Sequence, residues 1–243
     1  MAGLEGKTAI VTGASSGIGA ATARALADNG ARVAGGARRV DHLETEVALE
    51  LDVTDPQSCE RFVEQAVTEL GGLDVLVNNA GLGLGREPFD QSTEEDEETV
   101  LETNVRGVMR LTRLCLPHIR DGGHIVNLGS VAGRQPYENA AVYVTSKFAV
   151  RGFTYALRED LLGRPIHVTT VDPGLVETNF SRVRFRGDEG RAKAVYANVE
   201  PLRPEDIAEC IVFALTRPPH VNVDELVVKA LAQSTAVRIV RDD

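Results

Sequence analysis

The feature that most constrains this fold is a glycine-rich turn, T-G-A-S-S-G-I-G at Thr12 to Gly19, between a short apolar run and a helical segment. Gly13 permits a tight turn, Gly17 lets backbone amides approach an anion, and Gly19 lets the helix pack closely on the strand. At the start of a chain, this arrangement is typical of a dinucleotide site in which a helix N-terminus faces a pyrophosphate. The alternative is a turn with a purely structural role.

Short β-rich runs alternate with longer segments of helical period along the chain. We expect strands at Thr8 to Val11, Arg32 to Gly36, Ala48 to Leu51, Asp74 to Val77, His124 to Leu128, Ile166 to Val171 and Leu226 to Lys229. We expect helices at Gly17 to Asn29, Pro56 to Leu70, Glu94 to Leu116, Ala141 to Leu162 and Pro204 to Thr216. The alternation predicts an α/β fold, a doubly wound parallel sheet of about seven strands with helices on both faces.

No repeat or linker marks a second domain, so we expect residues 1–243 to form a single domain. The periodic pattern weakens from Glu177 to Val199, where arginines and glycines follow Pro173 and Gly174. We interpret residues 177–199 as a mobile loop or a pair of short helices over the site, and as the substrate loop.

Length and composition narrow the class of protein. The chain of 243 residues is 43% apolar, which is ample for a buried core. A net charge of −10 argues against nucleic acid or an anionic membrane as a partner. Cys59, Cys115 and Cys210 are far apart and form no C-x-x-C motif, which indicates a reducing cytosol. Signal and membrane-spanning segments and metal-ligand spacing are not evident, so we expect a cytoplasmic protein without a metal.

The end of the second predicted strand indicates which dinucleotide is bound. An acidic residue there pairs with the ribose hydroxyls of NAD, whereas arginine accommodates the additional phosphate of NADP. Here Ala37 is followed by Arg38 and Arg39. NADP(H) is therefore favoured, with Ser15 as a further phosphate contact. The alternative is that both arginines are exposed loop residues.

An acid/base centre is indicated by Ser130, Tyr143 and Lys147. Tyr143 and Lys147 are four residues apart, so on a helix both project from one face. A free tyrosine titrates near pH 10, and we expect the ammonium of Lys147 to favour the phenolate. Ser130 could hold a substrate oxygen beside the phenol. The alternative is a chance pair on an amphipathic helix.

These motifs occur together with N-N-A-G at Asn78 to Gly81, Asn104, and P-G-L-V-E-T at Pro173 to Thr178. In this order and spacing, the chain from about Gly6 to Thr178 resembles the short-chain dehydrogenase/reductase family. The resemblance implies a Rossmann-like sheet and an NADP(H)-dependent enzyme acting on CH–OH groups. It also implies a homo-oligomer, a dimer or tetramer, that pairs through the predicted helices beginning at Glu94 and Ala141.

The resemblance implies roles for individual residues. Tyr143 would be the general acid or base, while Lys147 would lower its pKa and bind the nicotinamide ribose. Ser130 would orient the substrate oxygen, and Asn104 would hold a water that extends the proton path. Cofactor contacts are implied at Gly13, Ser15, Ser16, Gly17, Ile18, Gly19, Arg38, Arg39, Asp52, Val53, Asn79, Ala80, Gly81, Tyr143, Lys147, Pro173, Gly174, Val176 and Thr178.

Three further stretches resemble the branch of this family that contains NADP-dependent serine, allo-threonine and 3-hydroxy acid dehydrogenases. They are N-N-A-G-L-G-L-G-R-E-P from Asn78, S-R-V-R-F-R-G-D-E-G-R-A from Ser181, and P-H-V-N-V from Pro219. A hydroxy acid carries a carboxylate, which one of the loop arginines could bind in bidentate fashion. Of these we choose Arg184 as the substrate contact. The alternative is that the arginines face water or a neighbouring subunit.

Two departures from the family pattern are visible. Only twelve residues separate Arg39 from Asp52, which is short for the helix usual there, and Glu97 stands where the branch would have an aromatic residue. The leading hypothesis is hydride transfer between NADP(H) and the carbinol or carbonyl carbon of a small 3-hydroxy acid, hydroxy amino acid or semialdehyde. The same chemistry on a bulkier secondary-metabolite, sugar or acyl substrate is an alternative. A non-catalytic NADPH-binding regulator is a remote one.

Overall fold

The computed structural model of the chain describes residues 3–242 and contains a seven-stranded sheet, all parallel, in the order β3-β2-β1-β4-β5-β6-β7. The strands are β1 (Thr8–Thr12), β2 (Arg32–Ala37), β3 (Val47–Glu50), β4 (Leu73–Asn78), β5 (Ile119–Leu128), β6 (Ile166–Pro173) and β7 (Glu225–Val228). This order, with its reversal beside β1, is the doubly wound Rossmann-like arrangement, and the predicted fold class is confirmed.

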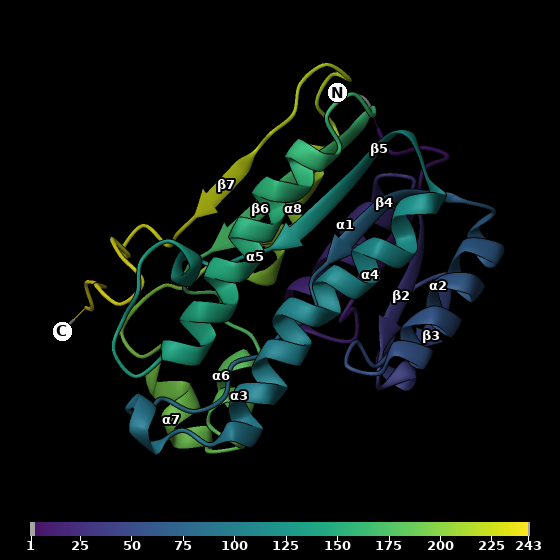
Figure 1. Cartoon of the computed structure of the whole chain (residues 1–243). Helices are drawn as coiled ribbons and strands as arrows, with labels where there is room; N and C mark the ends of the chain where they lie inside the picture. Colours follow the sequence, from purple (N-terminus) through teal and green to yellow (C-terminus); the bar gives the residue numbers. More distant parts are fainter. Residues whose placement is uncertain (1–2, 243) are drawn as a thin grey trace.

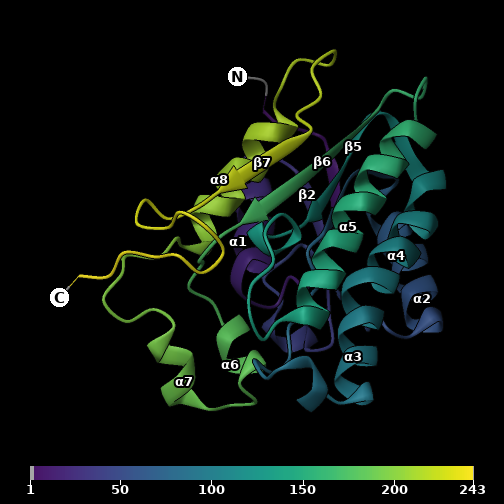
Figure 2. The ribbon, with the colours of Figure 1, turned by 60° about the vertical axis from the view of Figure 1, so that its left-hand side comes forward.

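Helices cover both faces of the sheet (Figures 1 and 2). They are α1 (Gly17–Asp28), α2 (Pro56–Leu70), α3 (Glu94–Leu101), α4 (Gly107–Cys115), α5 (Ala141–Asp160), α6 (Phe180–Arg184), α7 (Glu189–Ala194) and α8 (Pro204–Leu215). On one face, α1 and α8 bury Leu26, Ile207 and Ile211 against the sheet. On the other, α2, α4 and α5 contribute residues such as Phe62 and Leu111 to a second apolar cluster. Each face therefore has its own core.

Local signals account for the boundaries of α2, which begins and ends where the sequence predicts. The side chain of Asp55 accepts a hydrogen bond from the backbone of Gln57, and Pro56 occupies the first turn. Gly71 follows the helix in the left-handed conformation, with φ of 73°. The cap, the proline and the glycine together fix both ends of this helix.

The helix predicted at Glu94 to Leu116 differs in detail from the structure. It is divided into α3, a π-helical segment at Glu102–Arg106, and α4. A π segment places one more residue in a turn than an α-helix, and it is common at functional sites. It carries Asn104, which the sequence analysis singled out.

The connection between β2 and β3 contains only a short 3-10 turn at Val40–His42 in place of a full helix. The short spacing between Arg39 and Asp52 predicts that a full helix is missing here. β3 is the edge strand of the sheet on this side, and its residues alternate between half-buried and exposed.

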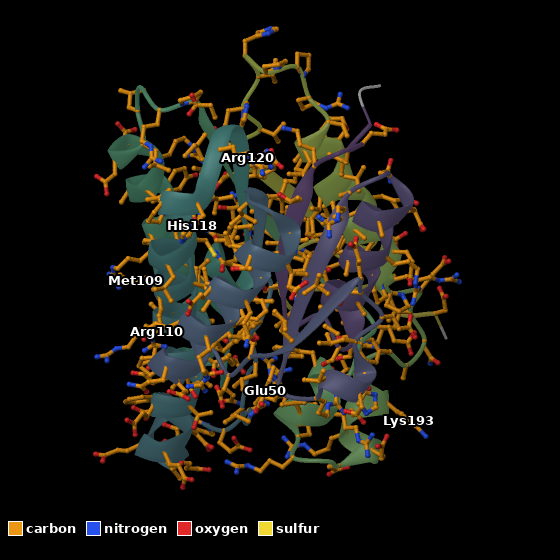
Figure 3. The ribbon with its side chains drawn as sticks, turned by 90° about the vertical axis from the view of Figure 1, so that its right-hand side faces the viewer. Glu50, Met109, Arg110, His118, Arg120 and Lys193 are labelled. Atoms are coloured by element: carbon orange, nitrogen blue, oxygen red, sulfur yellow. The ribbon has the colours of Figure 1, made fainter. Side chains whose placement is uncertain are left out.

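The carboxyl ends of the strands lie at one end of the molecule, together with α3, α6 and α7 (Figures 1 and 2). Glu50, the last residue of β3, and Lys193 of α7 lie toward this end, whereas Arg120, near the start of β5, lies toward the other (Figure 3). Open parallel sheets bind ligands outside the carboxyl ends of their strands.

In residues 3–242, no helix combines the length and apolar character needed to cross a membrane.

Candidate active site

A cavity of about 730 Å³ lies at the carboxyl edge of the sheet. The predicted site residues that line it are Gly13, Ser15, Ser16, Gly17, Ile18, Arg38, Arg39, Asp52, Val53, Asn79, Ala80, Gly81, Ser130, Tyr143, Lys147, Pro173, Gly174, Val176 and Thr178. Three other predicted residues, Gly19, Asn104 and Arg184, do not line this cavity. Each of them contacts residues that do.

The glycine-rich turn has the geometry of an anion cradle. Gly13 and Gly17 have φ of 68° and 55°, in the left-handed region that favours glycine. A Cβ on Gly19 would lie 2.3 Å from the carbonyl oxygen of Gly13. The side chain of Ser16 does not cap α1, so the first N–H groups of this helix are left for an anion. These features fit the pyrophosphate of a dinucleotide.

Arg38 and Arg39 follow β2 at the rim of the cavity. Both are exposed, and within residues 3–242 neither forms an ion pair. Burial raises the pKa of Asp52, but hydrogen bonds from Thr54 and the charge of Arg38 outweigh burial and hold the pKa below its ordinary value. Two unpaired guanidiniums at this position fit the additional phosphate of NADP.

Tyr143 and Lys147 lie one turn apart on α5, as predicted. The Lys147 Nζ is 5.9 Å from the centroid of the Tyr143 ring and donates a hydrogen bond of 2.8 Å to the carbonyl of Leu128. Ser130 follows β5, and its hydroxyl accepts a hydrogen bond from the backbone of Ala132. Ser130, Tyr143 and Lys147 therefore meet in the cavity from two adjacent elements.

The structure adds a second positive charge near Tyr143, the guanidinium of Arg184. Burial raises the pKa of Tyr143, and the guanidinium of Arg184 is the main opposing influence, followed by the hydroxyl of Ser130. Burial lowers the pKa of Lys147 to about 8, opposed by the charge of Asp172. The ammonium of Lys147 donates to the carbonyl of Leu128, and its effect on the phenol stays a prediction.

Arg184 of α6 lies over the catalytic ring. Its Cζ atom is 4.6 Å from the centroid of Tyr143 and 4.8 Å from that of Phe180. One terminal nitrogen donates to the hydroxyl of Tyr137 at 3.2 Å. The Nε and the other terminal nitrogen are buried, and within the described residues they have no hydrogen-bond partner. Two donor nitrogens of this buried guanidinium are therefore unsatisfied within the described residues.

Two contacts fix the position of α6 above the cavity. The backbone carbonyl of Arg184 accepts a hydrogen bond of 3.0 Å from the amide of Gly85. Beyond α6, Arg186 forms an ion pair with Asp96 at the start of α3. A Cβ on Gly83 would lie 2.7 Å from the Nη2 atom of Arg184, so a larger residue there would displace the guanidinium. The segment thus closes one side of the site.

Both the oxygen and the nitrogen of the Asn104 side-chain amide form hydrogen bonds. Its oxygen accepts from the amide of Leu82, and its nitrogen donates to the carbonyl of Leu82 and to the hydroxyl of Ser146. A Cβ on Gly81 would lie 3.2 Å from the Asn104 oxygen and 3.7 Å from the Lys147 ammonium. Asn104 and Lys147 therefore face the same short stretch of backbone.

Sequence reasoning missed Tyr137, Phe180 and Asp172. Tyr137 and Phe180 contact Arg184, and Asp172 is a buried carboxylate near Lys147. Two sequence signals were available: Tyr137 is an aromatic residue shortly after Ser130, and Asp172 is an acid directly before Pro173. Among the described residues, no group of three or more His, Cys, Asp and Glu side chains is arranged to hold a metal ion.

Comparison with known proteins places this geometry among oxidoreductases. A family model described as short chain dehydrogenase matches residues 7–189. An NADP-dependent 3-hydroxy acid dehydrogenase of Schizosaccharomyces pombe is 42% identical over 257 residues, 99% of each chain. An enzyme of that description in Escherichia coli K12 is 40% identical over 238 residues, 93% of this chain and 96% of its own. A structure of serine dehydrogenase in its closed form with NADP+ has a TM-score of 0.91 at 39% identity, covering 97% of this chain and all of the other.

Proposed function

The chain belongs to the short-chain dehydrogenase/reductase family, and from this premise we propose an NADP(H)-dependent dehydrogenase of a small 3-hydroxy acid or hydroxy amino acid. The enzyme is an oxidoreductase that acts on a CH–OH group, or on the corresponding carbonyl in the reverse direction. The relatives that support this assignment match nearly the whole chain. They are named as NADP-dependent 3-hydroxy acid dehydrogenases or as a serine dehydrogenase complexed with NADP+.

The cofactor site is divided among chain segments that fit its parts. The N-terminus of α1 and the turn at Gly13 would hold the pyrophosphate, and Arg38 and Arg39 the additional phosphate. Asp52 and Val53 would contact the adenine, and Val176 and Thr178 the carboxamide. When bound, NADP(H) supplies or accepts the hydride at its nicotinamide ring.

The chain itself supplies position and the proton. Ser130 and Tyr143 would hydrogen-bond the substrate oxygen and so place the carbinol or carbonyl carbon for hydride transfer. In reduction, the phenol of Tyr143 gives its proton to the carbonyl oxygen as the hydride reaches the carbon. In oxidation, the phenolate takes the hydroxyl proton. Lys147 would keep a positive charge beside this exchange and bind the nicotinamide ribose.

The observation that carries the substrate class is the pair of unpaired donors on Arg184. Burying a guanidinium with two unpaired donor nitrogens, Nε and Nη2, costs free energy. A carboxylate would accept hydrogen bonds from both nitrogens in bidentate fashion. Because the guanidinium covers the Tyr143 ring, the bound carboxylate would lie close to the carbon that reacts. A small acid whose carbinol carbon is two bonds from the carboxyl carbon, as in a 3-hydroxy acid, fits this arrangement.

The test is NADPH oxidation with small semialdehydes and keto acids, each paired with its methyl ester, and with NADH as the control cofactor. We expect the acids to be preferred, and Arg184→Ala to raise KM for an acid far more than for its ester. Arg182→Ala is the matched control, because Arg182 is exposed and paired with Glu189. Equal effects of Arg184→Ala on acid and ester would remove the carboxylate assignment. Preference for bulky neutral ketones would favour the alternative substrate class.

The proposal extends to assembly and location. Phe148 and Tyr155 on α5 are 40% and 39% exposed, large apolar groups that a second copy of the chain could cover. We therefore expect a dimer or tetramer, which the mass in solution would test. The cysteines are unpaired, in keeping with a cytoplasmic enzyme.

A further inference from the structure

Asp172 is a buried carboxylate that the proton exchange described above does not use. It lies near the end of β6, directly before Pro173 and Gly174 in the cavity wall, and is only 1% exposed. A Cβ on Gly129 would lie 1.9 Å from the Asp172 Oδ1 atom. The carboxylate therefore occupies the space that any other residue at position 129 would need.

The second oxygen of this carboxylate belongs to an ion-pair network. Arg134 Nε lies 2.6 Å from Asp172 Oδ2, and Arg134 Nη2 lies 2.5 Å from Glu225 on β7. Arg151 of α5 pairs with the other oxygen of Glu225 at 3.1 Å. Burial raises the pKa of Asp172, and the guanidinium of Arg134 opposes it. The network pairs the buried Asp172 carboxylate with a guanidinium.

Lys147 and Asp172 meet at one peptide unit. Lys147 donates to the carbonyl of Leu128, and this carbonyl belongs to the peptide bond that leads to Gly129, on which Asp172 packs. Lys147 is itself only 7% exposed, and an isolated ammonium is unstable at such a site. Asp172 is the buried charge that favours the charged form of this lysine.

We propose that Asp172, held in place by Arg134, is a positioning residue of the reaction. Its carboxylate fixes the Leu128–Gly129 peptide to which Lys147 donates, and it supplies the negative charge that keeps Lys147 an ammonium. This inference rests on the proposed function, because it assigns a residue to the same proton exchange. The ionisable groups that face the pair are Tyr143 of α5, Arg134 after β5, Glu225 of β7 and, beyond Tyr143, Arg184 of α6.

A titration that does not depend on turnover tests this role. The chain has four lysines, so carbon-13 at the lysine ε carbon gives four NMR signals, and Lys147→Met identifies the one of interest. Asp172→Asn keeps the size of the side chain and removes its charge. We expect the pKa of Lys147 to fall by about one unit. Glu225→Gln is the matched control, because it removes a carboxylate one step farther along the network, and the Lys147 signal should titrate as in the unaltered protein.

Turnover provides the second measurement. Since the ammonium is the active form, reduction is lost as pH rises through the pKa of Lys147, and Asp172→Asn should move this alkaline limb to lower pH. A one-unit shift predicts roughly an eightfold loss of kcat at about pH 8.5 but less than about twofold at about pH 6.5. Because only the charge is lost, KM for NADPH should change little.

The possible outcomes separate the two proposals. If the unaltered protein reduces hydroxy-acid precursors and Asp172→Asn leaves both the Lys147 titration and the pH profile unchanged, the role of Asp172 is overturned while the function stands. If no substrate is turned over, the function fails, and the NMR titration still decides the charge relationship. Should Asp172→Asn not fold, Asp172→Asn with Arg134→Gln removes both charges of the ion pair, and a smaller fall in the pKa of Lys147 is expected, because losing the Arg134 cation partly offsets losing the carboxylate.

Discussion

The guanidinium of Arg184 lies 4.6 Å from the centre of the Tyr143 ring and lowers the pKa that burial of the phenol raises. The two residues come from different elements, α6 and α5, and they meet only because α6 folds over the end of the sheet. The arginine that would bind the substrate carboxylate is thus also a charge that favours the phenolate. Under the proposed function, this contact would couple substrate binding to the proton exchange.

Removing this charge should alter the pH dependence of oxidation. Arg184→Met leaves the burial of Tyr143 in place, so the pKa of the phenol should rise. Oxidation requires the phenolate, and its rate increases as pH rises through that pKa, so the acidic limb of kcat should move to higher pH. The measurement uses a neutral hydroxy ester, so that carboxylate binding plays no part. Arg182→Met should leave the limb in place, and a shared shift would contradict the assignment.

Tyr143→Phe should strongly reduce turnover while largely keeping NADPH binding. The substitution removes the hydroxyl that exchanges the proton, and general acid–base catalysis contributes roughly a hundred- to ten-thousandfold. NADPH binding, followed by its fluorescence, should change by less than about threefold, because the α1 turn and Arg38 are unaffected. Turnover equal to that of the unaltered protein with every substrate would exclude Tyr143 as the proton donor.

Local signals in the sequence predicted much of this structure. The turn at Gly13, the cap and terminal glycine of α2, and the helical spacing of Tyr143 and Lys147 all depend on residues close in the chain. Spacing predicted that Tyr143 and Lys147 share a face. It did not predict that Lys147 would donate to the carbonyl of Leu128, nineteen residues away. That hydrogen bond is a tertiary contact, which helical spacing alone does not reveal.

The buried charges were the least predictable part of the site. Asp172 and Arg134 are 38 residues apart, and they pair only because β5 and β6 are neighbours in the sheet. The sequence pattern identified Arg184 as one of three loop arginines, but its stacking on Tyr143 depends on how α6 is held by Gly85 and Arg186. Such contacts follow from topology and not from local propensity.

Arg38→Asp should change the choice of cofactor. The substitution removes a cation from the rim of the cavity beside Asp52 and adds a carboxylate that repels the phosphate of NADP. A hydrogen bond to a charged group contributes about 1.5–3 kcal/mol, so KM for NADPH should rise roughly tenfold to a hundredfold. KM for NADH should stay the same or fall. Arg61→Asp, on the exposed side of α2, is the control of equal charge change, and a similar loss there would indicate a general electrostatic effect.

Two glycine-to-alanine substitutions should have opposite effects on stability. At Gly19 the new Cβ would lie 2.3 Å from the carbonyl of Gly13, so the tightly packed turn must shift, at a cost of roughly 1–3 kcal/mol in the free energy of unfolding. At Gly152, inside α5, a Cβ meets nothing within 4 Å, and alanine should stabilise the helix by roughly 0.5–1 kcal/mol. Urea titration measures both changes.

Gly19→Ala should also weaken NADPH binding, whereas Gly152→Ala should not, because only the turn at Gly13 to Gly19 faces the pyrophosphate. This outcome would show that the close approach of Gly19 to Gly13 serves both folding and cofactor binding. Unaltered stability and unaltered NADPH affinity in Gly19→Ala would mean that the turn can relax. The approach of the Gly19 backbone to Gly13 would then not be what shapes the cofactor site.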